Sequence, residues 1–278
     1  MGKTFSIPMT VPSKYERVLL TGAAGGLGKV LRAGLKPHAK MLRLSDREPM
    51  GEAQAQEEIV PCELGDREAV NRLVAGCDAI AHFGGVSTEA KFDPILQANI
   101  VGVFNVYEAA RRHGVKRVVF ASSNHVVGYY KQSEVIDADD PMRPDGLYGV
   151  SKCFGESLSR FYHDRHGIET ACLRIGSSFP APRDRRMLST YLSYPDLIEL
   201  VRCALYAPRV GHTVIFGMSD NKKKFWDNSK AAHIGFRARD SADGERERVE
   251  AAGPPLPADD PAAIYQGGAF VHAGPFDD

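Results

Sequence analysis

Short apolar runs alternate with amphipathic segments along most of the chain. Amphipathic patterns at helical spacing cover residues 66–75, 92–113 and 148–166. The strand-like runs are "RVLL" at 17–20, "MLRLS" at 41–45, "DAIAHF" at 78–83, "RVVFAS" at 117–122, "TACLRI" at 170–175 and "TVIF" at 213–216. Strands that alternate with helices form right-handed crossovers, which build a parallel sheet covered on both faces. The pattern therefore predicts an α/β fold with a doubly wound parallel Rossmann sheet.

The same pattern divides the chain into three parts. Residues 1–16, which include two prolines, precede the first strand and are expected to form an arm. Residues 17–176 carry the regular alternation and are predicted to form a dinucleotide-binding core. In residues 177–278 the alternation loosens and proline and glycine increase, which favours a small substrate-covering region around the last strand over an independent domain. The tail from Ala251 is expected to be irregular.

Composition narrows the class of protein. The 278 residues include 35 basic and 35 acidic side chains, so the charge balance gives no reason to expect a nucleic-acid or membrane partner. No run approaches the roughly 18 apolar residues of a spanning helix, and no signal peptide is recognised at the N-terminus. The scattered cysteines, without a C-x-x-C pair, fit reduced core thiols: Cys62, Cys77, Cys153, Cys172 and Cys203. A soluble cytoplasmic protein is expected.

A glycine-rich turn follows the first predicted strand. "TGAAGGLG" places Gly22, Gly25 and Gly28 three residues apart, before a helix that begins near Leu27. Glycine permits a tight turn and a close backbone approach to a pyrophosphate, whose charge then faces the helix N-terminus. Such a motif is weak alone, but its place between a strand and a helix supports it. Together with Gly26, these residues are predicted to bind a dinucleotide.

An acidic residue ends the second predicted strand. Asp46 lies eighteen residues after Gly28, close to where a carboxylate should bind the adenosine ribose. Its charge would repel a 2′-phosphate, which favours NAD over NADP, although the adjacent Arg47 could tolerate NADP. Two further segments are expected beside the cofactor, "CELGD" with Glu63 and Leu64 near the adenine and "HFGG" with Phe83, Gly84 and Gly85 near the phosphates and ribose.

A tyrosine and a lysine are placed for acid and base chemistry. "YGVSK" puts Tyr148 and Lys152 four residues apart, on one face of a predicted helix. Free tyrosine has a pKa of about 10, which a neighbouring ammonium and a positive cofactor ring would lower. Ser123, at the end of another strand, could orient the reacting hydroxyl. The pair alone is more often a surface feature, and its combination with the glycine turn favours catalysis.

Polar side chains follow three predicted strands. They are Ser87 in "GGVS", Asn124 and His125 in "SSNH", and Ser177 in "RIGSS". Because ligands of doubly wound sheets bind beyond the carboxyl ends of the strands, these groups should meet in one pocket. Hydroxyls, an amide and an imidazole suit a sugar, since each sugar hydroxyl removed from water needs a partner.

An arginine cluster follows the last of these segments. "FPAPRDRRMLSTYLSY" holds three arginines within four residues, namely Arg183, Arg185 and Arg186. A guanidinium fork matches a carboxylate with two parallel hydrogen bonds. Loop arginines are more often merely solvated.

The chain resembles the extended short-chain dehydrogenase/reductase family through "TGAAGGLG", "ASSNHVVG" and "YGVSK". The resemblance covers roughly residues 17–235. It implies that Tyr148 is the acid/base, that Lys152 binds the nicotinamide ribose and lowers the tyrosine pKa, and that Ser123 steadies the substrate. Asn99 and Ile175 are expected as further cofactor contacts. Many relatives carry small residues where this chain has Asn124 and His125.

Longer stretches are similar to family members that oxidise hexuronic acids with NAD: "SSNHVVGYY", "RPDGLYGVSKCFGE", "LRIGSS" and "RRMLSTYLS". This similarity implies oxidation of D-galacturonate and D-glucuronate at C1 to an aldaro-lactone. The implied substrate-binding residues are Ser87, Ser123, Asn124, His125, Ser177 and Arg186. Arg186 would take the sugar carboxylate. Glu63 stands where relatives usually have aspartate, which leaves the detail of adenine contact open.

Two other functions remain open. A nucleotide-sugar epimerase or dehydratase would share the cofactor apparatus, although only 126 residues follow Lys152. A dinucleotide sensor would need no acid/base pair. No metal site is predicted, because His163 and His166 precede Gly167 and are typical of a helix C-terminus. The family resemblance adds a four-helix seam along 92–113 and 148–166, so a homo-oligomer is expected.

Overall fold

The computed structural model describes residues 14–274 and 276. All strand pairs are parallel, in the order β3-β2-β1-β4-β5-β6-β7. The strands are β1 (Tyr15–Thr21), β2 (Ala39–Ser45), β3 (Glu57–Ile59), β4 (Ala79–His82), β5 (Arg117–Ser123), β6 (Glu169–Ile175) and β7 (His212–Gly217). The predicted doubly wound Rossmann sheet is confirmed.

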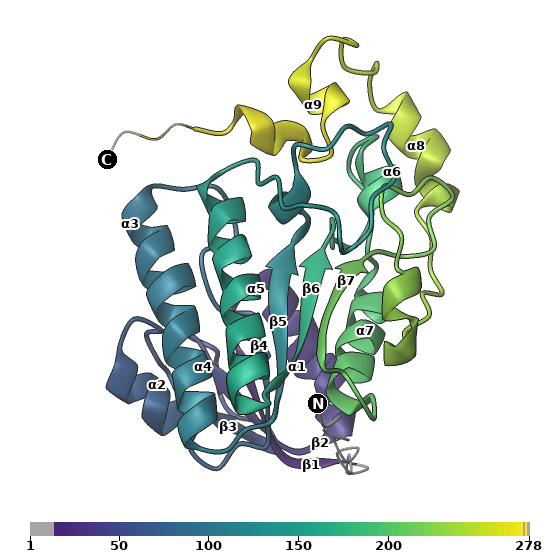
Figure 1. The fold of residues 1–278 in the computed structure, drawn as a ribbon. Coiled ribbons are helices and arrows are strands. Elements are labelled where there is room, and N and C mark those ends of the chain that lie inside the picture. Colours follow the sequence, from purple (N-terminus) through teal and green to yellow (C-terminus); the bar gives the residue numbers. More distant parts are fainter. Residues whose placement is uncertain (1–13, 275, 277–278) are drawn as a thin grey trace, which may run out of the picture.

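Helices cover both faces of the sheet (Figure 1). In the described part of the chain they are α1 (Gly26–Leu35), α2 (Arg67–Val74), α3 (Phe92–Ile95), α4 (Gly102–Arg112), α5 (Leu147–His166), α6 (Met187–Thr190), α7 (Tyr194–Tyr206), α8 (Arg246–Ala251) and α9 (Pro261–Ile264). Leu31 of α1 and Leu197 of α7 are buried against one face. Val70 of α2, Val106 of α4 and Tyr162 of α5 are buried against the other. Two apolar layers therefore hold the sheet between them.

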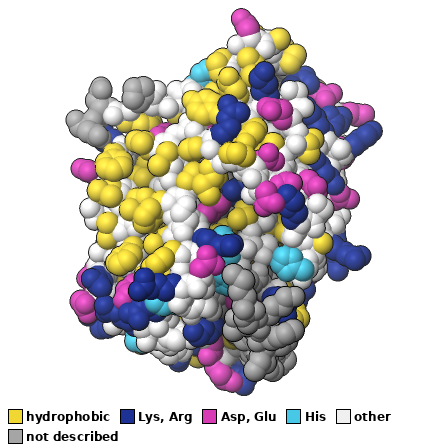
Figure 2. Space-filling model, in the orientation of Figure 1, with side chains coloured by type: hydrophobic (Ala, Val, Ile, Leu, Met, Phe, Trp, Pro, Cys, Tyr) yellow, Lys and Arg dark blue, Asp and Glu magenta, His cyan; other side chains and the backbone are white. Residues whose placement is uncertain are grey.

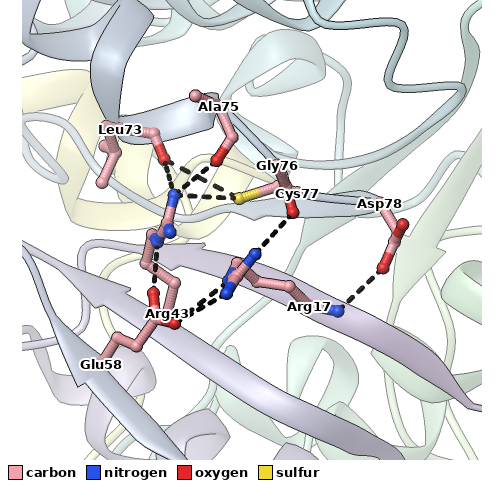
Figure 3. A network of polar contacts seen from close by, with 8 residues as sticks. All are labelled: Arg17, Arg43, Glu58, Leu73, Ala75, Gly76, Cys77 and Asp78. Atoms are coloured by element: carbon pink, nitrogen blue, oxygen red, sulfur yellow. Dashed lines mark hydrogen bonds and ion pairs between the residues drawn. The ribbon is translucent and has the colours of Figure 1, made fainter.

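Strand β3 lies outside the six predicted runs because charged residues hold it. Glu58 receives hydrogen bonds from Arg17 of β1 and Arg43 of β2, at 2.9 and 2.8 Å (Figure 3). The same arginines donate to the carbonyl groups of Leu73, at the end of α2, and of Ala75 and Gly76 in the turn that follows. The edge strand is thus fixed by ion pairs, which a search for apolar periodicity does not detect.

Most predicted element boundaries agree with the structure within a few residues. The predicted helix 92–113 spans α3, a wider π-helical turn (Leu96–Val101) and α4, and the predicted helix 148–166 is α5. The first strand begins at Tyr15, earlier than expected, and residues 1–13 of the predicted arm lie outside the described residues. The tail is more ordered than predicted, because α9 and a 3₁₀ turn (Gly268–His272) follow Ala251.

Helices α8 and α9 and the 3₁₀ turn Gly268–His272 lie beyond the carboxyl ends of β5, β6 and β7, together with α6 (Figure 1). Main-chain hydrogen bonds join this tail to the loop after β5, including Gln266 N to Tyr130 O and Gly267 N to Gly128 O, both 2.8 Å. Segments far apart in the sequence therefore cover the same edge of the sheet. Within residues 14–274 and 276, no helix combines the length and apolar character needed to span a membrane.

A buried ion pair lies behind this edge. Arg174 of β6 and Glu156 of α5 are each only 2% exposed and are joined by two hydrogen bonds of 3.0 and 2.9 Å. Ser122 of β5 donates to the same carboxylate at 2.5 Å. The network links β5, β6 and α5, which are the three elements that carry Ser123, Ile175 and Tyr148.

We predict that Glu156→Leu lowers the free energy of unfolding by about 3–5 kcal/mol, because it leaves the Arg174 charge buried without a partner. The double variant Glu156→Leu/Arg174→Met should regain most of that loss, since no buried charge remains. Urea unfolding of both variants checks this. A single variant within about 1 kcal/mol of the wild type would contradict the role given to the ion pair.

Candidate active site

The glycine turn between β1 and α1 forms a cradle of bare backbone. Gly22 has φ +73°, and a Cβ there would lie 2.6 Å from the Phe83 carbonyl carbon. A Cβ on Gly28 would lie 1.9 Å from Gly22 O. Helix α1 begins at Gly26, and no described side chain caps it at Gly25. Free amide groups at a helix N-terminus, approached closely through glycine, fit a pyrophosphate.

Asp46 lies against this turn. Its Oδ2 atom accepts a hydrogen bond from Ala24 N at 3.0 Å, and its Oδ1 atom accepts one from Glu48 N at 3.1 Å. The carboxylate is therefore beside the glycine cradle, as ribose binding requires. Leu64 is buried next to Gly84, where an added Cβ would lie 2.9 Å from Leu64 Cδ1, whereas Glu63 is exposed.

The loop after β4 is clamped onto α5. Asn99 accepts a hydrogen bond from Val86 N and donates to Val86 O and to the Ser151 hydroxyl of α5. Glu89 accepts from the backbone N–H groups of Leu147 and Tyr148, each at 2.8 Å. These contacts give Asn99 a role in fixing the loop, and its direct contact with the cofactor stays a prediction.

Ser87 is exposed and lies in the sequence between Val86, which Asn99 holds, and Glu89, which binds the start of α5. A Cβ on Gly85, whose φ is +137°, would lie 2.5 Å from Asn99 Oδ1, so glycine is needed where the loop passes Asn99. The loop that carries Gly84, Gly85 and Ser87 is therefore held at a fixed position relative to the start of α5.

Tyr148 and Lys152 are both buried on α5 and face the end of β5. The Lys152 ammonium donates to Ala121 O at 2.8 Å and lies 5.5 Å from the centre of the Tyr148 ring. Ser123 ends β5, and its side chain is near enough to that of Tyr148 to influence the pKa of the phenol. The structure thus brings together the three residues that the sequence predicts for proton transfer.

Burial governs the pKa values of this group. It raises the pKa of Tyr148 to about 12, and the nearby Ser123 side chain acts in the opposite direction. It also lowers the pKa of Lys152 to about 8. The expected lowering of the tyrosine pKa is therefore not found in the protein alone, because desolvation outweighs the effect of Ser123.

Asn124 and His125 follow β5 in a short 3₁₀ turn (Asn124–Val127) and point to different partners. The His125 Nδ1–H group donates to Asp145 Oδ2 at 2.8 Å. Burial lowers the pKa of His125, while the hydrogen bond to Asp145 acts in the opposite direction. Because a carboxylate only accepts, this contact fixes the neutral tautomer and leaves Nε2 as an acceptor for a ligand hydroxyl.

Arg186 lies among neutral acceptors. Its Nε atom donates to Gln266 O at 2.5 Å, and its Nη1 atom donates to Ser177 Oγ at 3.3 Å. With its amide in the orientation that satisfies both ends, Asn124 accepts from Arg186 Nη2 at 2.7 Å and donates to Ile175 O. The predicted residues Asn124, Ser177 and Arg186 therefore meet at one site.

The charge of Arg186 has no ion-pair partner among the described residues. Burial lowers the pKa of its guanidinium, with Asp184 and Asp145 acting in the opposite direction. A desolvated cation without a counter-charge is a strong site for an anion, and the guanidinium fork favours a carboxylate. The other two arginines of the cluster differ, because Arg183 is exposed and Arg185 donates to backbone carbonyls at 250 and 253.

Four residues at this edge were not predicted: Glu89, Asp145, Gln266 and Phe270. The Phe270 ring stacks on His125 with 3.6 Å between ring centres. Asp145 stands within the quoted motif "RPDGLYG", and an acid three residues before Tyr148 was a usable signal. Gln266 and Phe270 belong to "QGGAF" in the tail, where no periodicity indicates a site. Within the described residues, no cluster of three His, Cys, Asp or Glu side chains could hold a metal ion.

Comparisons with known proteins agree with this geometry. The model of the NAD dependent epimerase/dehydratase family matches residues 18–193. A uronate dehydrogenase of Pseudomonas syringae pv. tomato is 59% identical over 271 residues, which cover 97% of this chain and 98% of that protein. A uronate dehydrogenase of Agrobacterium fabrum is 50% identical over 256 residues, or 92% of this chain and 97% of that protein.

Solved structures give the same result. The crystal structure of uronate dehydrogenase from Agrobacterium tumefaciens is similar with a TM-score of 0.92 and 49% identity, over 95% of this chain and 99% of that chain. A tyrosine-to-alanine mutant of that enzyme was solved in complex with NAD, with the same TM-score. The family resemblance seen in the motifs is thus confirmed. The chain belongs to the NAD dependent epimerase/dehydratase family, within the short-chain dehydrogenases/reductases.

Proposed function

We propose that this protein is an NAD-dependent uronate dehydrogenase, which oxidises D-galacturonate and D-glucuronate at C1 to the aldaro-lactone. The observation that carries the proposal is the partly buried Arg186 guanidinium, which has only neutral partners and contacts Asn124, next to the His125 ring that packs against Tyr148. The names of the relatives at 50% and 59% identity support it. A carboxylated sugar supplies the missing counter-charge.

The rest of the pocket suits a hydroxylated ring. In the proposal Arg186 binds the sugar carboxylate, and Ser87, Ser177, Asn124 and His125 bind hydroxyl groups. The His125 imidazole supplies an acceptor at Nε2, since Asp145 fixes its other nitrogen. Each hydroxyl that leaves water then finds a partner, which an apolar pocket would not provide.

The reaction needs one proton transfer from the C1 hydroxyl. Tyr148 accepts that proton as the C1–H bond breaks, so C1 becomes the carbonyl carbon of the lactone. Ser123 donates a hydrogen bond that steadies the reacting oxygen, and Lys152 holds the nicotinamide ribose. When bound, NAD supplies the hydride acceptor and a positive ring charge, which lowers the pKa of a neighbouring phenol.

The cofactor would lie along the carboxyl ends of β1, β2 and β4. The glycine turn from Gly22 to Gly28 holds the pyrophosphate, and Asp46 binds the adenosine ribose, which favours NAD over NADP. The other proposed cofactor contacts are Glu63, Leu64, Phe83, Gly84, Gly85, Asn99, Tyr148, Lys152 and Ile175. In the same account, residues 17–176 form the cofactor core and residues 177–278 cover the substrate.

A nucleotide-sugar epimerase or dehydratase is the less supported alternative. Such a function needs room for a nucleotide, whereas the tail packs over the carboxyl edge of the sheet through Gln266 and Phe270. A free sugar acid fits the enclosed arrangement better.

We also propose that the protein works as a homo-oligomer in the cytoplasm. Apolar side chains remain exposed on neighbouring helices, namely Phe92 of α3, Phe104 of α4, and Leu147, Val150 and Phe161 of α5. Figure 2 shows hydrophobic side chains gathered over these helices. A second copy related by two-fold symmetry would cover this helical face with the same residues. The cysteines are free thiols, which fits a reducing compartment.

The substrate proposal predicts NADH formation with galacturonate and glucuronate but not with galactose or glucose. Arg186→Ala should lower kcat/KM for the uronates by at least about 100-fold, since a hydrogen-bonded charge pair is worth roughly 3 kcal/mol. Arg183→Ala is the matched control, because that arginine is exposed. NADH absorbance measures both. Equal activity on neutral sugars would contradict carboxylate recognition, and UDP-sugar epimerisation would become the next assay.

Because the pKa of Lys152 is lowered, we predict that replacing this lysine increases the stability of the fold by an amount that depends on pH. Below about pH 8 the folded protein carries the full cost of this buried charge. Between about 8 and the ordinary lysine value of 10.5, the unfolded chain keeps a proton that the folded chain has released, so stability rises with pH. Lys152→Met should therefore abolish activity yet stabilise the fold at pH 7 by roughly 2 kcal/mol.

Urea unfolding at pH 7 and pH 10 measures this difference, with the exposed Lys222→Met as the control. The gain should shrink at the higher pH for Lys152→Met alone. An equal loss of stability at both pH values would show that the lysine is not destabilised by burial.

The oligomer proposal predicts that Phe161→Glu separates the copies. A charge placed on the apolar helical face cannot be buried without a partner. Val135→Glu is the matched control, because Val135 is 68% exposed and lies outside these helices. Sedimentation velocity should show an oligomer for the wild type and the control, and a monomer for Phe161→Glu. A monomeric wild type would refute the proposal.

A further inference from the structure

The tail segment Gln266–Gly267–Gly268 makes an unusual set of buried contacts at the active site. The Gln266 side chain is fully buried and uses both ends of its amide. Its Oε1 atom accepts from Trp226 Nε1 at 2.9 Å, and its Nε2 atom donates to Lys131 O and Glu134 O at 3.1 and 3.0 Å. Three hydrogen bonds therefore fix the position of the Gln266 main chain.

The main chain fixed in this way holds the arginine. The carbonyl oxygen of Gln266 accepts from Arg186 Nε, which is the one guanidinium nitrogen that cannot join a fork directed at a carboxylate through Nη1 and Nη2. The two terminal nitrogens instead contact the predicted substrate-binding residues, Nη1 to Ser177 and Nη2 to Asn124. The carbonyl therefore orients the guanidinium without competing for the ligand.

The two glycines that follow Gln266 leave space for the Arg186 side chain and for Asp145, which holds His125. A Cβ on Gly268, whose φ is +63°, would lie 2.4 Å from Arg186 Cδ. A Cβ on Gly267 would lie 1.8 Å from Asp145 Oδ2, the atom that holds His125. Any larger side chain at either position would push on Arg186 or on Asp145.

We propose that Gln266–Gly267–Gly268 is a positioning element for substrate recognition, which sets the orientation of Arg186 directly and that of His125 through Asp145. None of its three residues needs to touch the substrate. The inference rests on the proposed function, because it assigns Arg186 to the sugar carboxylate. It gives the tail a part in specificity that its irregular sequence does not indicate.

The test compares Gly268→Ala with Gly235→Ala. Both glycines have a positive φ, of +63° and +81°, so both variants carry similar backbone strain. Only Gly268 has a neighbour, since a Cβ on Gly235 meets nothing within 4 Å. Gly268→Ala should raise KM for galacturonate about tenfold or more while kcat changes less than about threefold. Gly235→Ala should change neither beyond about twofold, and NAD affinity should be equal in both.

A second variant tests the hydrogen bonds that fix the main chain of this element. Gln266→Met keeps the size of the side chain but removes its three hydrogen bonds, so it should reproduce the KM effect. If Gly268→Ala and Gly235→Ala give equal KM values, or if Gln266→Met lowers kcat alone, the positioning role is wrong.

A thermal-unfolding cycle separates this inference from the proposed function, because it needs no substrate. Gly268→Ala should lower Tm more than Gly235→Ala does in the wild type, but not in an Arg186→Ala background, where the crowded side chain is gone. Equal losses in both backgrounds would overturn the inference. A wild type that oxidises no uronate would instead overturn the proposed function.

Discussion

The desolvated charge of Arg186 is the constraint on which the site depends. A guanidinium among neutral acceptors is costly to bury, and the protein satisfies its nitrogens with a carbonyl, an amide and a hydroxyl and gives it no ion-pair partner among the described residues. A partly desolvated cation without a counter-charge favours the binding of an anion. The scaffold of β5, β6 and α5, tied by Arg174 and Glu156, supports the segments that carry Tyr148 and the proposed anion site.

Apolar periodicity predicted the central fold well, because the strands and helices that carry the core bury apolar side chains at regular spacing. Apolar periodicity did not predict elements that are held by ion pairs instead of apolar contacts. Strand β3 has Glu57 and Glu58 paired with arginines, so two of its three residues look exposed in the sequence although Glu57 is buried. The short helical elements of the tail were not predicted for another reason, since isolated elements of four or five residues leave no periodic signal.

The motifs predicted the residues that lie directly on strand ends and on one helix, such as Ser123, Tyr148 and Lys152, because local geometry fixes which way these side chains point. They did not predict residues that act through contacts across long stretches of sequence. Gln266 is eighty residues from Arg186, and Glu89 is 59 residues from Tyr148. Such pairings follow from the packing of the tail and loops, which no local spacing encodes. Burial raises the pKa of Tyr148 in the protein alone, whereas the expected lowering includes the charge of the cofactor ring.

In the proposed function a single bound sugar reaches both the carboxylate site at Arg186 and the proton acceptor at Tyr148. A crystal structure of the Tyr148→Phe variant with NAD and galacturonate tests this most directly, because it holds the substrate without turnover. The account predicts both carboxylate oxygens within about 3 Å of the terminal nitrogens of Arg186, with the C1 hydroxyl beside Ser123 and the ring of residue 148. A carboxylate turned away from Arg186, with C1 distant from residue 148, would contradict it.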